Sequence, residues 1–260
     1  MIRTENISFA HGKKNVLKNI SFNVKKGEIY GVMGPNGSGK TTLTKVITNF
    51  YKNYTGKIFV EEKEIKMMTH REITSKMSVV TQENNVFMPY SVEEIILSGR
   101  YHNKKFFGNY SEEDFEVVKE LMKKINIYEI RNKNINKISG GEKQLAFIAR
   151  ALASESDTII FDEPTSNLDM GHNGEIFKII KSINREYGKT IIIISHDINF
   201  IMSLCNRVMV MDKGVNIFTG NPKEVLDGNI LQNLYNIPLI YSMENNQIKY
   251  VIPDITDKLL

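Results

Sequence analysis

The sequence predicts an α/β domain that carries a helical insertion. Two aliphatic runs, Thr158 to Phe161 and Thr190 to Ile194, are each followed by polar residues and a helical stretch. That pattern is typical of buried parallel strands in a layered α/β protein. A further strand, Glu28 to Met33, runs directly into a glycine-rich turn, and residues 84–154 carry mostly helix signals.

Composition indicates one globular protein. The chain has 260 residues, of which 41% are apolar and 25% charged, with 34 basic and 30 acidic side chains. This length can bury one substantial core without a disulfide or metal. The single cysteine, Cys205, excludes an internal disulfide framework and fits an intracellular protein. The first residues lack the apolar core of a signal peptide, and no aliphatic run is long enough to span a bilayer.

The net charge of +4 does not indicate a nucleic-acid partner, because of how the charges are distributed. The segment from Arg100 to Lys137 contains nine basic and six acidic residues, so it alone supplies +3 of the net charge of +4. Lys119, Lys123 and Lys124 come after Glu112, Glu113, Asp114 and Glu116, an order that complements a helix dipole. We therefore expect a solvated helical face here and no nucleic acid.

The elements follow in order from local patterns. Partial alternation of apolar and polar residues predicts strands at about 2–9 and 17–24. Four boxes of Ser or Thr followed three residues later by an acid mark helix starts, because the two side chains cap free backbone amides. These boxes are Thr69 to Glu72, Ser91 to Glu94, Ser111 to Asp114 and Ser139 to Glu142.

The strongest chemical signal is a complete phosphate loop between the strand ending at Met33 and a predicted helix. Its glycines let the backbone fold around an anion, whose phosphates the exposed amides and helix dipole bind. Lys40 can contact the β- and γ-phosphate oxygens, and the Thr41 hydroxyl can ligate Mg²⁺. The strand and helix context disfavours a merely flexible turn. The candidate nucleotide-binding residues are Gly34, Pro35, Asn36, Gly37, Ser38, Gly39, Lys40, Thr41 and Thr42.

A second signal is the pair of acids, Asp162 and Glu163, that ends the run beginning at Thr158. Adjacent strand residues point to opposite sides, so we expect the two carboxylates to have different roles. Asp162 is suited to hold Mg²⁺, and Glu163 can act as general base for the water that attacks the γ-phosphate. A simple turn is the alternative, and the phosphate loop upstream makes it less favoured.

A third signal is Ile138-Ser-Gly-Gly-Glu142. A capping box alone does not explain its two glycines, whereas a helix start with a serine and two residues without side chains can approach a phosphate closely. With this motif the sequence resembles the ATP-binding-cassette ATPases, whose signature is usually LSGGQ or LSGGE. The contacts implied by the resemblance are Ser139, Gly140, Gly141 and Glu142.

The resemblance covers essentially the whole chain, because other family motifs follow in the family's order. Gln82 resembles the glutamine loop, Ser166 to Asp169 the D-loop, and His196 the switch histidine. The implied fold is a P-loop NTPase core of the ABC type, with an N-terminal antiparallel β subdomain and an inserted α-helical signature subdomain. The implied boundaries are 1–83 and 155–222 for the core, 84–154 for the helical subdomain and 223–260 for a C-terminal extension.

The family's mechanism implies that two cassettes bind ATP head to tail. Ser139, Gly140 and Gly141 would then complete the partner's site, and Asp169 would also contact nucleotide. The catalytic residues implied in the chain's own site are Lys40, Gln82, Glu163 and His196, and the implied magnesium ligands are Thr41, Gln82 and Asp162. Family members commonly stack an aromatic residue on adenine, and the matching position is His11, with Phe9 as the alternative.

Further likeness points to the ATPase subunits of importers for iron-siderophore complexes, haem and cobalamin. The stretches that carry it are 90–101, 220–226 and 250–253. It implies a peripheral homodimer on the cytoplasmic face of the membrane, a transmembrane permease and an extracytoplasmic binding protein. Val86, Phe87, Met88 and Tyr90 would then form a partly exposed patch for the permease, with burial in the core of the insert as the alternative.

Two other functions fit the sequence less well. A soluble cassette ATPase of DNA repair, translation or cofactor assembly is disfavoured, because such proteins usually carry a second cassette, a long coiled coil or a zinc module. A regulatory module without turnover is disfavoured because Glu163 and His196 are both present.

Overall fold

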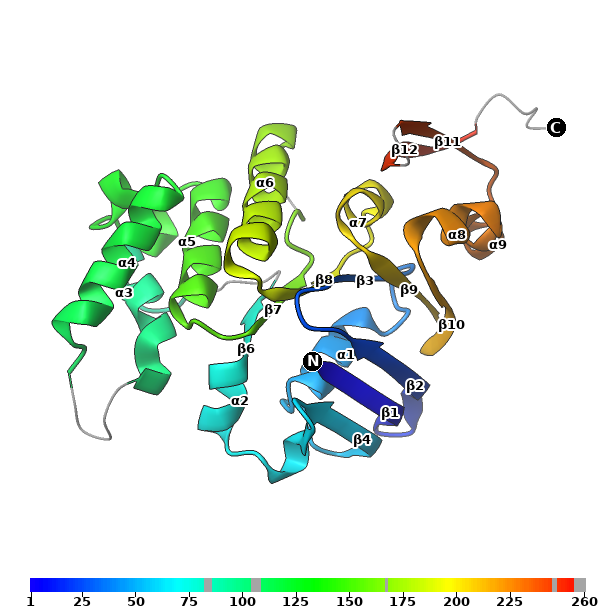
Figure 1. The fold of residues 1–260 in the computed structure, drawn as a ribbon, viewed down its shortest axis with the longest axis horizontal. Coiled ribbons are helices and arrows are strands. Elements are labelled where there is room, and N and C mark those ends of the chain that lie inside the picture. Colours follow the sequence, from blue (N-terminus) through cyan, green and yellow to red (C-terminus); the bar gives the residue numbers. More distant parts are fainter. Residues whose placement is uncertain (82–85, 104–108, 167, 245–246, 255–260) are drawn as a thin grey trace. The chain divides into compact units, whose positions relative to one another are not determined.

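The computed structural model describes residues 1–81, 86–103, 109–166, 168–244 and 247–254. The chain divides into two compact units: the first is Met1–Met67 with Thr190–Leu260, and the second is Met68–Lys189. Both contain helices and strands, which confirms the predicted α/β class (Figure 1).

An antiparallel sheet forms the N-terminal part of the first unit. Its strand order is β2 (Lys14–Val24), β1 (Ile2–His11), β4 (Tyr54–Val60) and β5 (Lys63–Glu64), followed by the short helix η1 (Ile65–Met67). Ile2 and Ile7 of β1 and Ile20 of β2 are fully buried, so one face of the sheet lies on the core. The two strands expected near 2–9 and 17–24 are confirmed, and both extend further toward the turn between them.

A second sheet of the first unit leads to the phosphate loop. Strand β3 (Ile29–Met33) pairs in parallel with β8 (Thr190–Ile194) and with β9 (Arg207–Asp212), and β10 (Val215–Gly220) is antiparallel to β9. Every residue of β3 and β8 is buried, as their continuous apolar runs predicted. Helix α1 (Lys40–Ile47) comes after β3, and α7 (Ile198–Leu204) comes after β8.

The C-terminal part of the first unit contains two short helices and a hairpin, namely α8 (Pro222–Asp227), α9 (Ile230–Tyr235), β11 (Leu239–Glu244) and β12 (Gln247–Pro253). The amide of Asn199 in α7 holds the hairpin: its Nδ2 donates to Val251 O at 3.1 Å and its Oδ1 accepts from Val251 N at 2.6 Å. The extension thus packs on the unit that carries the phosphate loop.

The second unit is mostly helical. Its elements are α2 (His70–Lys76), β6 (Met77–Val80), α3 (Val92–Leu97), η2 (Ser98–Asn103), α4 (Glu112–Lys124), η3 (Tyr128–Ile130), η4 (Ile135–Lys137), α5 (Gly140–Ala153), β7 (Thr158–Asp162) and α6 (Met170–Tyr187). Strands β6 and β7 pair in parallel, and α3 and α4 both pack against α5. All four predicted capping boxes are present with both hydrogen bonds, at Thr69, Ser91, Ser111 and Ser139. The inserted helical segment is therefore confirmed.

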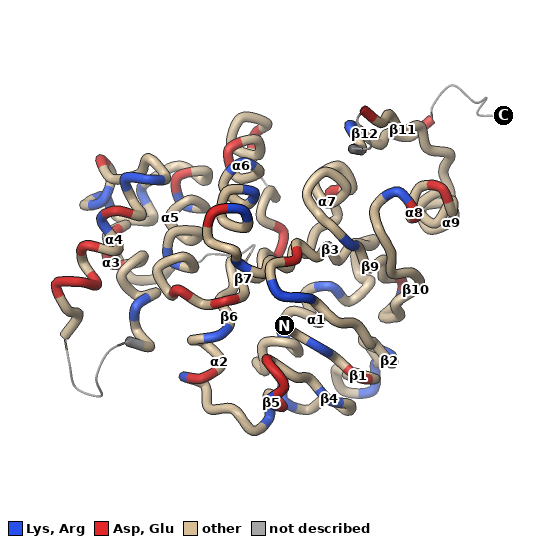
Figure 2. The backbone as a smooth tube through the Cα atoms, in the orientation of Figure 1, with Lys and Arg blue, Asp and Glu red and all other residues tan. Residues whose placement is uncertain are grey.

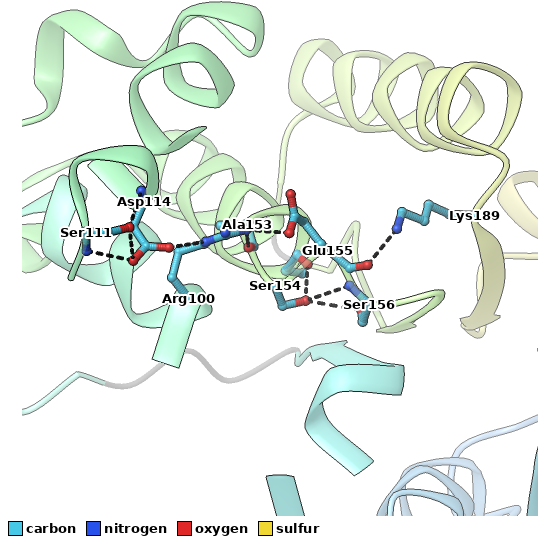
Figure 3. A network of polar contacts seen from close by, with 9 residues as sticks. Arg100, Ser111, Asp114, Ala153, Ser154, Glu155, Ser156 and Lys189 are labelled. Carbon is cyan, nitrogen blue, oxygen red and sulfur yellow. Dashed lines mark hydrogen bonds and ion pairs between the residues drawn. The ribbon is translucent and has the colours of Figure 1, made fainter. Parts of the chain in front are cut away.

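A buried ion pair ties the helices of the second unit together (Figure 3). Arg100 Nε donates to Asp114 Oδ1 at 2.7 Å, and both residues are only 5% exposed. Arg100 Nη1 also donates to Ala153 O at 3.1 Å and lies 2.7 Å from Glu155 Oε2. One guanidinium thus joins η2, the start of α4 and the end of α5.

Charge along α4 follows the predicted order. Its first turn holds Glu112, Glu113 and Asp114, and its last turn holds Lys123 and Lys124. Figure 2 shows this order, with red segments mainly toward the start of the helix and blue segments toward its end. Among the helices formed by the described residues, none is both long enough and apolar enough to be a membrane span.

Candidate functional site

The phosphate loop of the first unit is closed around its own lysine. Lys40 is 6% exposed, and its Nζ donates to Gly34 O at 2.8 Å and to Pro35 O at 3.1 Å. Helix α1 begins at this residue, with Gly39 as N-cap and no side chain capping the helix. The first amides of α1 have no acceptor within the helix, so the loop presents N–H groups and an ammonium to a bound anion.

Two glycines are required here by close approach of neighbouring chain. A Cβ at Gly34 would lie 3.0 Å from Ser38 Oγ and closer still to the carbonyl oxygen of Met211. A Cβ at Gly39, where φ is 102°, would lie 3.1 Å from Val16 O and from Leu17 Cδ2. Strands β2 and β9 therefore fix the curvature of the loop from outside. Asn36, Gly37 and Thr41 are exposed, Pro35 and Thr42 are half-buried, and Ser38 is buried.

The structure brings His196 to the same edge of the first unit as the phosphate loop. Val32 of β3 pairs with Ile194 of β8, so both strands end at the same level. His196 is exposed two residues after β8. The turn around it is held by the amide of Ser195, which donates to Val32 O at 3.1 Å, and by the amide of Asp197, which donates to Ser195 Oγ at 3.0 Å. Two of the predicted site elements thus follow neighbouring parallel strands.

His11 lies in an aromatic cluster at the end of β1. Its ring is edge-on to Phe9 at 4.8 Å and to Tyr51 at 5.1 Å between centroids. Phe9 is 7% exposed and stacks on Tyr51 with an interplanar angle of 7°. Of the two adenine candidates, His11 is exposed and Phe9 is buried. Sequence reasoning missed Tyr51, whose only signal was an aromatic pair, Phe50 and Tyr51, after the helix that follows the phosphate loop.

The two acids of the second unit end β7. Asp162 is the last residue of the strand and is 4% exposed, and Glu163 is 8% exposed. Glu163 lies beyond the strand with φ at 54°, so the alternation expected along a strand does not extend to this residue. This left-handed conformation costs a non-glycine residue about 1–2 kcal/mol. The turn is closed by Ser166, whose amide and hydroxyl both donate to Glu163 O, at 3.3 Å and 2.9 Å.

The serine–glycine motif begins α5 as predicted. Ser139 Oγ accepts from the amide of Glu142 at 3.2 Å, and Glu142 Oε2 accepts from the amide of Ser139 at 2.8 Å. The latter bond lowers the pKa of Glu142. Ser139 and Gly140 are exposed and Gly141 is buried. The amides of Gly140 and Gly141 belong to the first turn and have no acceptor within the helix, which makes this end suited to an anion.

Asp169 caps the next helix, α6. Its Oδ1 accepts from the amide of His172 at 2.9 Å and lies 2.9 Å from Nδ1 of the same residue. The amide hydrogen bond lowers the pKa of Asp169. Sequence reasoning gave His172 no role, since a lone histidine in a helix carries no motif. Gln82, also expected in the site, lies outside the described residues.

Comparison with known proteins identifies the family that this chain matches. The model of the family described as ABC transporter matches residues 17–166. Petrobactin import ATP-binding protein YclP of Bacillus subtilis is 32% identical over 95% of this chain and 98% of its own. Iron(3+)-hydroxamate import ATP-binding protein FhuC of B. subtilis is 28% identical over 91% of this chain and 88% of its own. Arginine transport ATP-binding protein ArtM of the same species is 37% identical, over 86% of this chain and 92% of its own.

Solved structures of ABC proteins are also similar to this chain. An inward-facing ABC transporter assigned to the metal-chelate type has a TM-score of 0.84 and 25% identity, covering 97% of this chain and 96% of that one. The ATP-binding cassette MJ0796, as a dimer in a post-hydrolysis state with ADP and Pi, has a TM-score of 0.74 and 28% identity. That match covers 85% of this chain and 99% of the cassette.

Proposed function

The chain belongs to the ABC transporter family as one of its ATP-hydrolysing subunits, and from that premise we propose that it powers the import of a metal chelate of the ferric-siderophore type. The observation that carries the substrate class is the similarity to YclP, an import protein for petrobactin, across 95% of this chain. FhuC, whose name gives iron(3+)-hydroxamate, supports the same class. ArtM is the more identical protein but matches a smaller share of the chain, 86%.

In this proposal the first unit binds the nucleotide. The amides of the phosphate loop and of α1 hold the phosphates, with the Lys40 ammonium on the β- and γ-oxygens. To do so, Lys40 exchanges its bonds to Gly34 O and Pro35 O for phosphate oxygens. His11 contributes its exposed ring to the adenine. His196 contacts the γ-phosphate region from the turn after β8.

Magnesium fits the donor set. The Thr41 hydroxyl and the Asp162 carboxylate offer hard oxygen atoms, which Mg²⁺ prefers. Among the described residues there is no group of three or more His, Cys, Asp or Glu side chains that could hold an ion by themselves. The ion is therefore expected to arrive with the nucleotide and to neutralise charge on its phosphates, with Gln82 as a further ligand.

Glu163 supplies the general base. Its carboxylate accepts a proton from the water that attacks the γ-phosphate, and its backbone is in the left-handed conformation directly after the strand that ends at Asp162. A strained conformation is tolerated where function requires a particular direction of the side chain.

A second copy of the chain completes the site. Ser139, Gly140 and Gly141 of one copy meet the γ-phosphate bound by the other, with Asp169 and Glu142 beside them. Residues of two subunits must then converge before turnover is efficient, so closure of the dimer gates hydrolysis. The dimeric cassette MJ0796 with ADP and Pi supports this arrangement.

The remaining partners follow from the importer class. We propose a peripheral location on the cytoplasmic face, a permease that spans the membrane, and an extracytoplasmic binding protein that delivers the substrate. Residues 84–154 form the helical subdomain, 1–83 and 155–222 the core, and 223–260 an extension.

Uptake in the source organism tests the proposal. Deleting the gene should lower the uptake of ⁵⁵Fe bound to a siderophore, and the parent gene should restore it while Lys40→Ala should not. Uptake of labelled arginine is measured in the same strains. Unchanged iron uptake together with a loss of arginine uptake would reject the substrate class, and loss of neither would favour a soluble cassette ATPase.

A further inference from the structure

His172 connects two segments of the second unit. From the first turn of α6 its backbone amide and its ring nitrogen Nδ1 both face Asp169 Oδ1, each at 2.9 Å. The side chain is 37% exposed, and the contact of its Nδ1 with Asp169 helps to fix its position. The ring is therefore held by the residue that caps its own helix.

On its other side the same imidazole covers the start of α5. A Cβ built at Gly141 would lie 2.6 Å from Cγ of His172 and closer still to Cδ2 and Nε2. The ring thus fills the space in which any other residue at position 141 would place its side chain. Gly141 is buried, whereas Ser139 and Gly140 on the same turn are exposed.

A second contact joins the same two segments. A Cβ at Gly140 would lie 3.7 Å from Cδ2 of Leu168, which is ordinary van der Waals distance. Leu168 immediately precedes Asp169. The first turn of α5 therefore rests on the stretch from Leu168 to His172, and the His172 ring is held within that stretch by the Asp169 carboxylate.

We propose that His172 is a positioning residue: held by Asp169, its ring sets the first turn of α5 so that the Gly140 and Gly141 amides meet the nucleotide of the partner subunit. This inference rests on the proposed head-to-tail dimer. It also explains why residue 141 must be a glycine. A side chain there would overlap the ring. Because the ring is held at Nδ1, it could move aside only by breaking its bond to Asp169.

The test measures ATP-driven dimerisation. In a Glu163→Gln background, His172→Ala should bind a fluorescent ATP analogue with the parental affinity, because the phosphate loop lies in the first unit. Misplacement of the α5 amides should raise the protein concentration at half-dimerisation by about tenfold to a hundredfold. His70→Ala, an exposed histidine at the start of α2, is the matched control and should leave this concentration unchanged.

A double variant separates positioning from a general loss of stability. Gly141→Ala alone should abolish dimerisation, because its methyl group displaces the ring. Gly141→Ala with His172→Ala should dimerise as well as His172→Ala alone, since the clash has been removed. If the double variant is as defective as Gly141→Ala, the methyl group blocks the partner's nucleotide directly and the proposal is overturned. Melting temperatures are measured throughout, and His172→Asn, which keeps a donor toward Asp169, replaces His172→Ala if the latter is unstable.

Ser139→Arg in the same background distinguishes failure of the positioning role of His172 from failure of the head-to-tail site itself. If Ser139→Arg prevents dimerisation while His172→Ala and His172→Asn both dimerise at the parental concentration, His172 has no positioning role and the composite site stands. If Ser139→Arg also dimerises normally, the head-to-tail site itself is wrong.

Discussion

Phe87→Asp tests the docking of this subunit on a permease. Phe87 is 96% exposed, Met88 58% and Tyr90 45%, and Val86 is half-buried. The predicted exposure of this patch is thereby confirmed, and burial of Phe87 in the core of the insert is wrong. The patch belongs to the second unit, where the side-chain Nδ2 of Asn136 donates to Val86 O at 2.8 Å.

The size of the effect follows from that exposure. An exposed side chain without partners can be replaced at a cost within about 0.5 kcal/mol, so the isolated subunit should keep its melting temperature and its basal ATPase activity. Burial of a phenylalanine against a partner contributes about 1.5–3 kcal/mol. Losing that contribution corresponds to roughly tenfold to hundredfold weaker association, and a buried carboxylate adds to the loss.

The assay is co-purification of the tagged subunit with the permease, together with uptake in cells. Phe50→Asp is the matched control, since Phe50 is 72% exposed in the other unit. We expect loss of co-purification and uptake for Phe87→Asp alone. A Phe87→Asp subunit that still co-purifies and supports uptake would refute the docking surface, and a lowered melting temperature would refute the reasoning from exposure.

Three further outcomes follow from the structure. Arg100→Leu should lower the free energy of unfolding by about 3–5 kcal/mol in urea, because it leaves Asp114 buried without its cation, while the exposed Arg185→Leu should change it little. Burial raises the pKa of Asp114, but hydrogen bonds from Arg100 and Ser111 outweigh it and leave that pKa below its ordinary 3.8. The ionised Asp114 carboxylate therefore stabilises the fold fully at pH values above its ordinary pKa of 3.8. Its contribution is lost as the pH falls through the lower pKa that it has in the folded protein. Asp114→Asn should flatten that part of an acid titration followed by circular dichroism, and an unchanged acid limb would contradict the assignment. Chelation of magnesium by EDTA should abolish ATP hydrolysis without changing the melting temperature of the nucleotide-free protein. A lower melting temperature in EDTA would indicate a resident ion instead. Thr41→Ala should raise the magnesium concentration needed for half-maximal rate.

Local signals made the helix starts and the phosphate loop predictable. A capping box needs only residues three apart, so Ser111 and Ser139 could be placed from the sequence. Continuous aliphatic runs likewise predicted the buried strands β7 and β8, because a parallel strand is covered on both faces. Asn221, which caps α8 in the same way, was missed although its box with Glu224 has the same spacing.

Contacts between distant residues could not be predicted in this way. The sequence indicated Gly141 as a phosphate-binding residue, but in the structure Gly141 also packs against the ring of His172, 31 positions later. The left-handed turn at Glu163 has no sequence signal, since glutamate rarely adopts it. The aromatic contact of His11 with Tyr51 joins β1 to the segment after α1. Each depends on tertiary packing, which overrides local preference.

Steady-state ATP hydrolysis by Glu163→Gln tests the central claim that this chain is an ATPase with Glu163 as its base. The amide keeps the size of the side chain and removes its ability to accept the proton, so turnover should fall by about 10²–10⁴-fold while binding of ATP persists. The variant is measured beside the parent at saturating Mg-ATP, with binding of a fluorescent ATP analogue as the control for folding. Hydrolysis by Glu163→Gln at the parental rate would contradict the account.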